Sequence, residues 1–384
     1  MKKRVLHISH LYPSVKGPFL GTFMGELNES LSNLYEVSFL IPTPTSIPFT
    51  ERWKINRSTL IHSNVKRVHY WSIPKRKKPT LTKRFLLKNI LANISASQSD
   101  IIHIHWAYPE ILLLPEIKKL GKPVFITFHG YLFYDIFNNN SLRPYLYEAI
   151  NSADKIFTVG KQLETDIKTY FPQQSSKVFH IANGINENKF VLGDKKSARN
   201  KLGFSQDKIH ILCVANLAHE KGLDVLVDAI AASSILKSSH LHIIGRTIDQ
   251  SLLKGIKTVI KEQNIKNITI HGPVPHEELA RYYHASDAFV LPSRVEGFGV
   301  ALVEAGMCGL PMVSTYSGGP AEIISSEIGL LAQAGDINDL RNKLETLLDN
   351  IENYNPERIR SLMIENFSQS TVVKSIQAHY EDLL

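Results

Sequence analysis

Cysteine and long apolar runs are both scarce in this sequence of 384 residues. The only two cysteines, Cys213 and Cys308, lie in apolar segments, which excludes a disulfide framework and a thiolate metal site. No apolar run approaches the roughly 18 residues of a membrane span, and the run beginning at Ile111 is soon ended by a proline. His7 and His10 interrupt the apolar N-terminal segment, and no small-residue cleavage site follows it. We therefore expect a cytoplasmic protein without a membrane-spanning segment.

Two motifs of nucleotide chemistry are also missing. No Asp-x-Asp motif is present to hold a metal ion against a diphosphate, so we expect no metal and no other cofactor. No predicted strand leads into an intact Gly-x-Gly-x-x-Gly turn, which argues against a nicotinamide-dependent dehydrogenase.

Basic residues outnumber acidic ones, 44 to 36, and the excess lies in the first half of the chain. Much of it falls in residues 75–78 and at Lys83, Arg84 and Lys88, interleaved with apolar residues at roughly helical spacing. Two interpretations stay open: a solvated helix face, or a surface attracted to anionic lipid. A nucleic-acid partner is not expected, because the patch is short and no binding module accompanies it.

Short runs rich in Val, Ile and Phe alternate with segments of helical period, the pattern of parallel sheets built from βαβ units. In the first half we predict strands at residues 5–9, 36–41, 65–71, 101–106, 124–128, 156–159 and 178–181. In the second half we predict strands at residues 210–215, 240–244, 268–271, 288–291, 312–314 and 328–331. The chain is too long for one core, so we place two α/β domains at residues 1–183 and 184–367, and a Ser-capped terminal helix at residues 368–384.

The strongest site signal is the segment 291–299, in which a strand end is followed by a glycine-containing turn and a helix. In a parallel sheet such a turn lies at the carboxyl edge, where ligands bind. The N–H groups at the helix start favour anions, whereas Glu296 and Glu304 suit the hydroxyl groups of a ribose or another sugar. Glu304 as an ordinary surface residue is the competing interpretation, against which the strand-turn-helix context weighs.

A second strand, loop and helix place Lys221 near a helix N-terminus. The helix dipole disfavours a cation at that end, and a bound diphosphate would remove the conflict. A solvated lysine is the alternative.

Several motifs together resemble those of glycosyltransferase family 4. They are the two glutamates Glu296 and Glu304 with seven residues between them, the Glu220–Gly222 turn, the Asn183–Asn186 junction and the segment Gly318–Glu322. The resemblance is most specific from residue 210 to 332 and weaker elsewhere. It implies the GT-B fold, two Rossmann-like domains facing a central cleft, with the C-terminal helix packing back on the first domain. The first domain would bind the acceptor and the second the nucleotide sugar.

The resemblance also assigns roles to residues. Glu296, His129 and Lys221 would be catalytic: Glu296 and His129 near the transferred sugar, and Lys221 on the diphosphate. Glu304 would bind the donor ribose. The full donor-binding set would be Gly21, Asn216, Lys221, Val274, Glu296, Gly297, Phe298, Gly299 and Glu304. His105 and Tyr131 would bind the acceptor.

One position departs from the family. Asn216 stands where the family usually carries an arginine, and an amide supplies no charge. Neutralisation of the diphosphate would then rest on Lys221 with help from Arg246 or Arg294.

The histidines His103, His105 and His129 raise a zinc hypothesis, because a His-x-His pair near a third histidine can ligate zinc. No carboxylate-rich cluster accompanies them, so polar recognition of a sugar by His105 and His129, and a buried hydrogen-bonded His103, are the preferred interpretations.

The resemblance implies a retaining, metal-independent hexosyltransferase that takes its sugar from a nucleoside diphosphate sugar, UDP rather than GDP. The acceptor would be a glycan or lipid-linked sugar of cell-envelope polysaccharide synthesis, met by peripheral contact with the inner face of the cytoplasmic membrane. Two alternatives stay open: a nucleotide-sugar epimerase of the same double-Rossmann plan, and a non-catalytic nucleotide-sugar-binding protein.

Overall fold

The structure is a computed structural model that describes the whole chain except residues 1, 13–21, 47–57, 63, 73–77 and 131. The chain divides into two compact units. Unit 1 comprises Met1–Ala182 together with Val372–Leu384, and unit 2 comprises Asn183–Thr371.

Unit 1 is built on one eight-stranded sheet of order β3-β4-β2-β1-β5-β6-β7-β8. Its strands are β1 (Arg4–Ile8), β2 (Glu36–Ser46), β3 (Ser58–His62), β4 (Val65–Ser72), β5 (Ile101–His105), β6 (Val124–Phe128), β7 (Lys155–Thr158) and β8 (Val178–His180). All neighbouring strands are parallel except β3 and β4, which are antiparallel.

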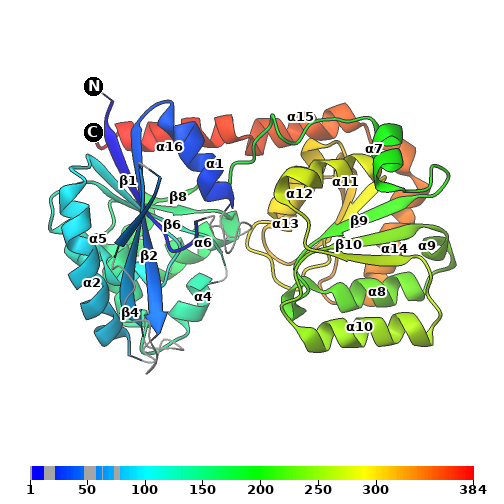
Figure 1. Ribbon diagram of the computed structural model, residues 1–384, viewed down its shortest axis with the longest axis horizontal. Helices are drawn as coiled ribbons and strands as arrows, with labels where there is room; N and C mark the ends of the chain where they lie inside the picture. The colour runs from blue at the N-terminus through cyan, green and yellow to red at the C-terminus, as the bar shows by residue number, and fades with distance from the viewer. Residues whose placement is uncertain (1, 13–21, 47–57, 63, 73–77, 131) are drawn as a thin grey trace. The chain divides into compact units, whose positions relative to one another are not determined.

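The helices of unit 1 cover both faces of this sheet (Figure 1). They are α1 (Thr22–Ser32), α2 (Pro79–Ala96), α3 (Leu114–Lys118), α4 (Leu132–Phe137), α5 (Arg143–Ser152), α6 (Lys161–Tyr170) and, from the other end of the chain, α16 (Gln369–Glu381), with short 3-10 turns at Glu110–Leu112 and Pro172–Lys177. On one face α1 and α16 bury Met24, Leu31 and Tyr380 against Val5 and Phe39. The opposite face carries the second apolar core, built mainly with α2, α3, α5 and α6.

Unit 2 has a six-stranded, wholly parallel sheet of order β11-β10-β9-β12-β13-β14. Its strands are β9 (His210–Val214), β10 (His240–Ile244), β11 (Ile268–Gly272), β12 (Ala288–Val290), β13 (Met312–Thr315) and β14 (Gly329–Ala332). Its helices are α7 (Lys195–Leu202), α8 (Leu223–Ala231), α9 (Ser234–Ser238), α10 (Gln250–Glu262), α11 (Leu279–Ala285), α12 (Val300–Met307), α13 (Pro320–Ile323), α14 (Ile337–Asp349) and α15 (Pro356–Phe367), with 3-10 turns at His219–Lys221, His276–Glu278 and Ile351–Asn353. In Figure 1, α8, α10 and α14 lie on one side of this sheet, and α7, α11 and α12 lie on the other.

Side-chain caps fix where several helices of unit 2 begin. Asp249 accepts hydrogen bonds from the N–H groups of Ser251 and Leu252, at 2.8 and 3.2 Å, at the start of α10. Asp194 and Asn355 cap α7 and α15 in the same way. These caps give partners to N–H groups that the first turn of each helix leaves unpaired.

The predicted fold of two parallel-sheet α/β domains is confirmed, and so is the packing of the C-terminal helix on the first domain. Ser368 caps α16 as expected, accepting from the N–H of Thr371 at 3.2 Å. Most predicted strands differ from the observed ones by one residue at one or both ends, and two differences are larger: β3 is an additional antiparallel strand, and β2 continues five residues past Ile41 to Ser46.

Prolines at positions 42 and 44 make the length of β2 unexpected, since proline cannot donate to a sheet ladder. The pairing of β1 with β2 ends at Ile8 and Leu40, so beyond that point β2 pairs only with β4. Because the carbonyl of Leu40 faces the β1 side, Pro42 and Pro44 present their missing donors to that same, no longer paired, side.

Candidate functional site

Lys221 and Glu296 meet at the carboxyl edge of the unit 2 sheet. Lys221 ends the turn that precedes α8, and Glu296 lies in the loop between β12 and α12. The ammonium Nζ lies 2.7 Å from Oε2 of Glu296, and the hydroxyl of Ser293 donates to the same oxygen at 3.2 Å. Both side chains are partly exposed, at 24% and 13%. A cation and an anion therefore share one partly exposed position at the edge where ligands of parallel sheets bind.

Backbone contacts hold the two loops against each other. The N–H groups of Arg294 and Val295 donate to the carbonyl of Glu220 at 2.8 and 3.3 Å. Gly222 has a φ of +64°, and a Cβ at this position would lie 2.1 Å from the carbonyl oxygen of Pro292. Only glycine allows this approach, so the turn that carries Lys221 is fixed by the glycine that follows it.

Arg294 is committed to this contact between the loops. Its two terminal nitrogens bind the two carboxylate oxygens of Asp224 at 2.8 and 2.7 Å, and one of them also donates to the carbonyl of His219 at 2.8 Å. A bidentate arginine of this kind is held in place. The geometry therefore argues against Arg294 as the second cation for a diphosphate.

Asn216 is used in backbone packing as well. Its Oδ1 accepts from the N–H of Arg246 at 3.2 Å, which ties the loop after β9 to the loop after β10. The guanidinium of Arg246 has no hydrogen-bond or ion-pair partner among the described residues, so of the two expected helpers Arg246 is the uncommitted one.

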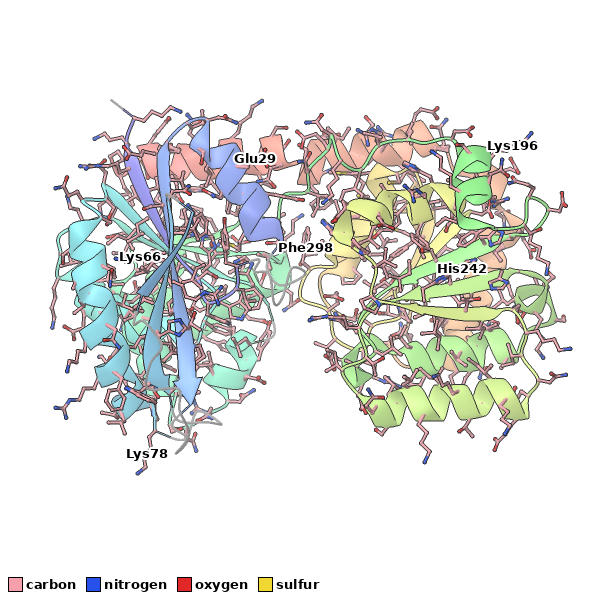
Figure 2. All side chains as sticks on the ribbon, viewed as in Figure 1. Glu29, Lys66, Lys78, Lys196, His242 and Phe298 are labelled. Atoms are coloured by element: carbon pink, nitrogen blue, oxygen red, sulfur yellow. The ribbon has the colours of Figure 1, made fainter. Side chains whose placement is uncertain are left out.

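The start of α12 lies beside Glu296. Gly299, with a φ of +102°, precedes the helix, and buried Phe298 lies in the same loop (Figure 2). The segment Gly318–Gly319 packs on this loop, because Glu296 N–H donates to the carbonyl of Ser317 at 2.9 Å and Gly319 N–H donates to the carbonyl of Glu296 at 3.0 Å. The first N–H groups of a helix have no partner within it, and here they open at the same edge as Lys221.

Glu304 lies further along α12 and is 3% exposed, so it is not a surface residue. Nε2 of His276 lies 2.6 Å from its Oε1, and the hydroxyl of Tyr283 donates to its Oε2 at 2.8 Å. Burial, and then the neighbouring Glu304 carboxylate, raise the pKa of Tyr283 well above its usual value, so the hydroxyl keeps its proton. Val274 lies two residues before His276 in the loop after β11. The expected ribose-binding glutamate is therefore present but held by two protein donors.

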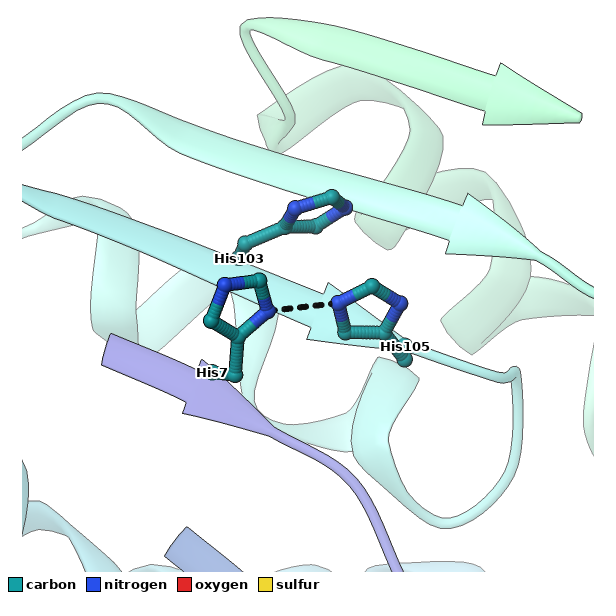
Figure 3. Close-up of side chains that lie close together, drawn as sticks. All are labelled: His7, His103 and His105. Carbon is teal, nitrogen blue, oxygen red and sulfur yellow. Dashed lines mark hydrogen bonds between the residues drawn. The ribbon is translucent and has the colours of Figure 1, made fainter. Parts of the chain in front are cut away.

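In unit 1, four histidines gather on the face of the sheet that α1 and α16 cover. Nδ1 of His7 lies 2.7 Å from Nε2 of His105 (Figure 3), and Nδ1 of His105 lies 3.3 Å from Nε2 of His129. His103 stacks on His105 with ring centroids 4.0 Å apart and contacts the hydroxyls of Tyr380 and Thr127 at 2.6 and 2.7 Å. The expected buried, hydrogen-bonded His103 is thus observed.

Burial lowers the pKa values of His7, His103 and His105. The pKa of His7 falls to about 3, and those of His103 and His105 fall well below their usual value, with smaller contributions from the neighbouring histidines. Three ligand nitrogens of His7, His103 and His105 lie within 4.8 Å of one another. However, the rings of His103 and His105 are stacked, and both nitrogens of each ring are already engaged in hydrogen bonds. This arrangement is typical of a hydrogen-bonded cluster and does not favour the zinc hypothesis.

The remaining predicted residues of unit 1 are placed only in part. Gly21 and Tyr131 lie outside the described residues. His105 is 2% exposed and bonded to two other histidines, so the geometry favours an indirect role through His129 over direct contact with an acceptor. Sequence reasoning did not assign His7, His276 and Tyr283 to a site, since none belongs to a motif and each is brought to its site by folding.

The comparisons with known proteins agree with this architecture. Two parallel-sheet α/β units are also the architecture of the GT-B glycosyltransferase structures on which this chain superposes. Residues 20–189 match the family described as Glycosyltransferase Family 4, and residues 194–360 match the family described as Glycosyl transferases group 1. The chain belongs to glycosyltransferase family 4.

Relatives and solved structures extend over most of the chain. An uncharacterised glycosyltransferase of Methanocaldococcus jannaschii is 27% identical over 97% of this chain and 98% of its own. The 2-deoxystreptamine N-acetyl-D-glucosaminyltransferase of Niallia circulans is 26% identical over 69% of this chain and 71% of its own. Sucrose-phosphate synthase of Thermosynechococcus elongatus superposes with a TM-score of 0.78 at 20% identity, covering 100% of this chain and 99% of its own. Anabaena HepE, solved with UDP and glucose, superposes with a TM-score of 0.75 at 16% identity over 100% of both chains.

None of the helices in the described ranges combines the length and the apolar character that crossing a bilayer requires.

Proposed function

We propose that this glycosyltransferase takes its sugar from a nucleoside diphosphate sugar bound at the carboxyl edge of the unit 2 sheet. The observation that carries the proposal is the partly exposed Lys221–Glu296 pair beside the N-terminus of α12. The ammonium and the helix N–H groups provide a site for the diphosphate. The carboxylate of Glu296 is suited to the hydroxyl groups of the sugar.

The departing diphosphate is stabilised by Lys221 and by backbone N–H groups near Phe298 and Gly299, without a metal ion. Arg246 supplies the second positive charge, since Arg294 is bound to Asp224. We assign His129 to contact with the transferred sugar. We assign no side chain as a general base. The reaction retains the anomeric configuration, as the family assignment leads us to expect.

Uridine diphosphate is the first donor nucleotide to test. The Anabaena structure was solved with UDP and glucose. A Corynebacterium glutamicum relative, 29% identical over 48% of this chain, is a GDP-mannose-dependent mannosyltransferase. A screen of UDP, GDP and ADP therefore decides between real alternatives. Specificity among bases depends on few contacts, of which the loop around Val274 is our candidate.

The proposed acceptor is a glycan or lipid-linked sugar of cell-envelope polysaccharide synthesis. One relative is an uncharacterised protein from the cps region of Klebsiella pneumoniae, 24% identical over 79% of this chain. Exposed Arg84 and Lys88 on α2 support peripheral contact with anionic lipid. Lys83 lies 4.0 and 3.8 Å from Glu116 and Glu148, and these carboxylates reduce its contribution to the positive surface. Equal sedimentation with neutral and anionic vesicles would contradict the membrane contact.

The donor assignment is tested by thermal shift against UDP, GDP, ADP and their sugars, with and without EDTA. Binding to the native state alone raises the apparent stability, so one nucleotide series should stabilise the protein, and EDTA should not abolish the shift. Release of the nucleoside diphosphate should then require an acceptor. Turnover of the donor without acceptor would favour the epimerase alternative, and binding with no turnover would favour the non-catalytic one. No shift with any nucleotide would contradict the proposal.

A further inference from the structure

Glu304 is held by more than its two direct partners. His276, which contacts its Oε1 at 2.6 Å, is itself contacted on the other side by Lys189, whose Nζ lies 2.6 Å from Nδ1 of the imidazole. Lys189 follows the junction at Asn183–Asn186, His276 begins the 3-10 turn after β11, and Glu304 lies on α12. Three segments remote in sequence thus form one line of contacts.

The chemistry of these groups fixes the direction of the hydrogen bonds. An ammonium has donors and no acceptor, so the Nδ1 that Lys189 approaches must accept. The hydrogen of the neutral imidazole then lies on Nε2, which donates to the Glu304 carboxylate. The order is Lys189 to His276 to Glu304, and it leaves one tautomer of His276.

Packing supports the same arrangement. The ring of Phe190, fully buried, meets the His276 ring edge-on with centroids 5.5 Å apart and an interplanar angle of 62°. Tyr283 holds the second carboxylate oxygen. Each carboxylate oxygen can accept more than one hydrogen bond, so one donor on each oxygen fixes the carboxylate while leaving it able to accept two neighbouring hydroxyls.

We infer that Lys189 and His276 are positioning residues that orient the Glu304 carboxylate toward the ribose hydroxyls of the nucleotide. This inference rests on the proposed function, together with the ribose contact that the family resemblance implies for Glu304. Lys189 acts through His276, whose tautomer it selects, and does not itself touch the nucleotide.

The test compares Lys189→Met, His276→Gln and the double variant. The ligands are the nucleoside diphosphate that stabilises the unmodified protein most and its 2′,3′-dideoxy analogue, with affinities measured by calorimetry. Glutamine at position 276 keeps an N–H donor for Glu304, and this donor does not depend on a contact with Lys189. Lys189→Met alone should weaken binding of the parent nucleotide about tenfold, as expected for one disturbed hydrogen bond to a charged group. It should hardly change the affinity for the dideoxy analogue. In the His276→Gln background, Lys189→Met should add no further loss. Lys237→Met, an exposed lysine of unit 2, is the matched control.

Other results would overturn the inference. Equal weakening of both ligands by Lys189→Met, or additive losses in the double variant, would mean that Lys189 acts otherwise than through the ribose contact, while the nucleotide site would stand. Nitrogen NMR of His276 should show hydrogen on Nε2 in the unmodified protein, and hydrogen on Nδ1 would refute the relay whether or not the variants fold. Failure of UDP, GDP and ADP to bind the unmodified protein would instead refute the proposed function, and the ribose contact with it.

Discussion

At the scale of single residues, the Lys221 ammonium has two possible partners, the carboxylate of Glu296 and the diphosphate of a donor. Its ammonium is bound to Glu296 at 2.7 Å, so a diphosphate competes with a carboxylate for the same cation. At about 4 Å an ion pair near a protein surface is worth on the order of 4 kcal/mol before the cost of desolvation. A donor with two negative phosphates can take over the cation, and Glu296 is then available to the sugar.

Replacing Lys221 by alanine should lower turnover by roughly 10² or more, because a preorganised charge at the leaving group is lost. Steady-state kinetics with saturating acceptor measure the effect. Lys237→Ala, an exposed lysine elsewhere in unit 2, should leave turnover unchanged. Near-full activity of Lys221→Ala would exclude its role on the diphosphate.

Replacing Glu296 by glutamine should act in two opposite directions. Affinity for the free nucleoside diphosphate should rise several-fold, because the competing carboxylate is gone, while turnover with the sugar donor should fall. Calorimetry and kinetics on the same preparation check both. A fall in affinity for the free diphosphate would show that the pair does not compete with it.

At the scale of elements, short loops at the ends of strands place the charged groups, and their geometry depends on glycine. Gly222 and Gly203 have nearly the same backbone conformation, with φ of +64° and +69°. A Cβ at Gly222 meets the carbonyl of Pro292 at 2.1 Å, whereas a Cβ at Gly203 meets nothing within 4 Å. The two positions therefore separate backbone strain from steric contact.

Gly203→Ala should destabilise unit 2 by about 1–2 kcal/mol, the cost of the left-handed conformation for an L-residue. Gly222→Ala should cost about 1–3 kcal/mol more, because the loop that carries Lys221 must move away from Pro292. It should also weaken nucleotide binding. Urea unfolding of both variants gives the comparison, and equal losses would contradict the contact.

The strands of unit 1 carry a second element-scale property, sensitivity to acid. His7, His103 and His105 are neutral when folded, since burial lowers their pKa values, that of His7 to about 3. The unfolded chain takes up protons near pH 6.5, so it binds more protons than the folded chain below that pH. The free energy of unfolding should thus be flat above pH 6.5 and fall as the pH drops from 6.5 toward 3.

At one pH unit below 6.5, each of these three histidines should have lowered the free energy of unfolding by about 1.4 kcal/mol. Urea unfolding of unit 1, followed at pH 7.5, 6.5 and 5.5, measures the slope. His7→Phe, which stays beside Phe39 and removes one buried imidazole, should reduce the slope by about one proton. An unchanged slope in that variant would contradict the assignment.

The same scale shows what the sequence can and cannot predict. Apolar strands such as Val124–Phe128 and His240–Ile244 were predictable to the residue, since their runs are bounded by polar turns. The strand β3 was not, because Ser58–His62 carries no such pattern and is paired through β4. Lys221, Glu296 and Glu304 stand in recognisable motifs, whereas the partners of Glu304 depend on packing between remote segments that no local pattern encodes.

At the scale of the whole molecule, α16 returns the chain to unit 1. Val372, Val373, Ile376 and Tyr380 are buried in its core, and Tyr380 also bonds His103. Unit 1 is therefore completed only when the last helix is present.

Deleting residues 372–384 should unfold or strongly destabilise unit 1 and leave unit 2 folded. Tyr380→Ala alone should cost about 3–5 kcal/mol, the usual range for removing a large buried aromatic side chain. Unfolding followed with one probe in each unit should show two transitions, of which only the unit 1 transition shifts. A common shift of both would contradict this division.

The point where the chain enters and leaves unit 2 has a consequence for protein engineering. Ile185 and Ser368 form a parallel bridge, in which Ile185 N–H donates to the carbonyl of Phe367 at 2.9 Å and Gln369 N–H donates to that of Ile185 at 2.8 Å. The two ends of unit 2 are therefore adjacent. Unit 2 can be exchanged for that of a homologue at residues 183 and 371 without rerouting the rest of the polypeptide, and under the proposed function this exchange should change the choice of sugar donor.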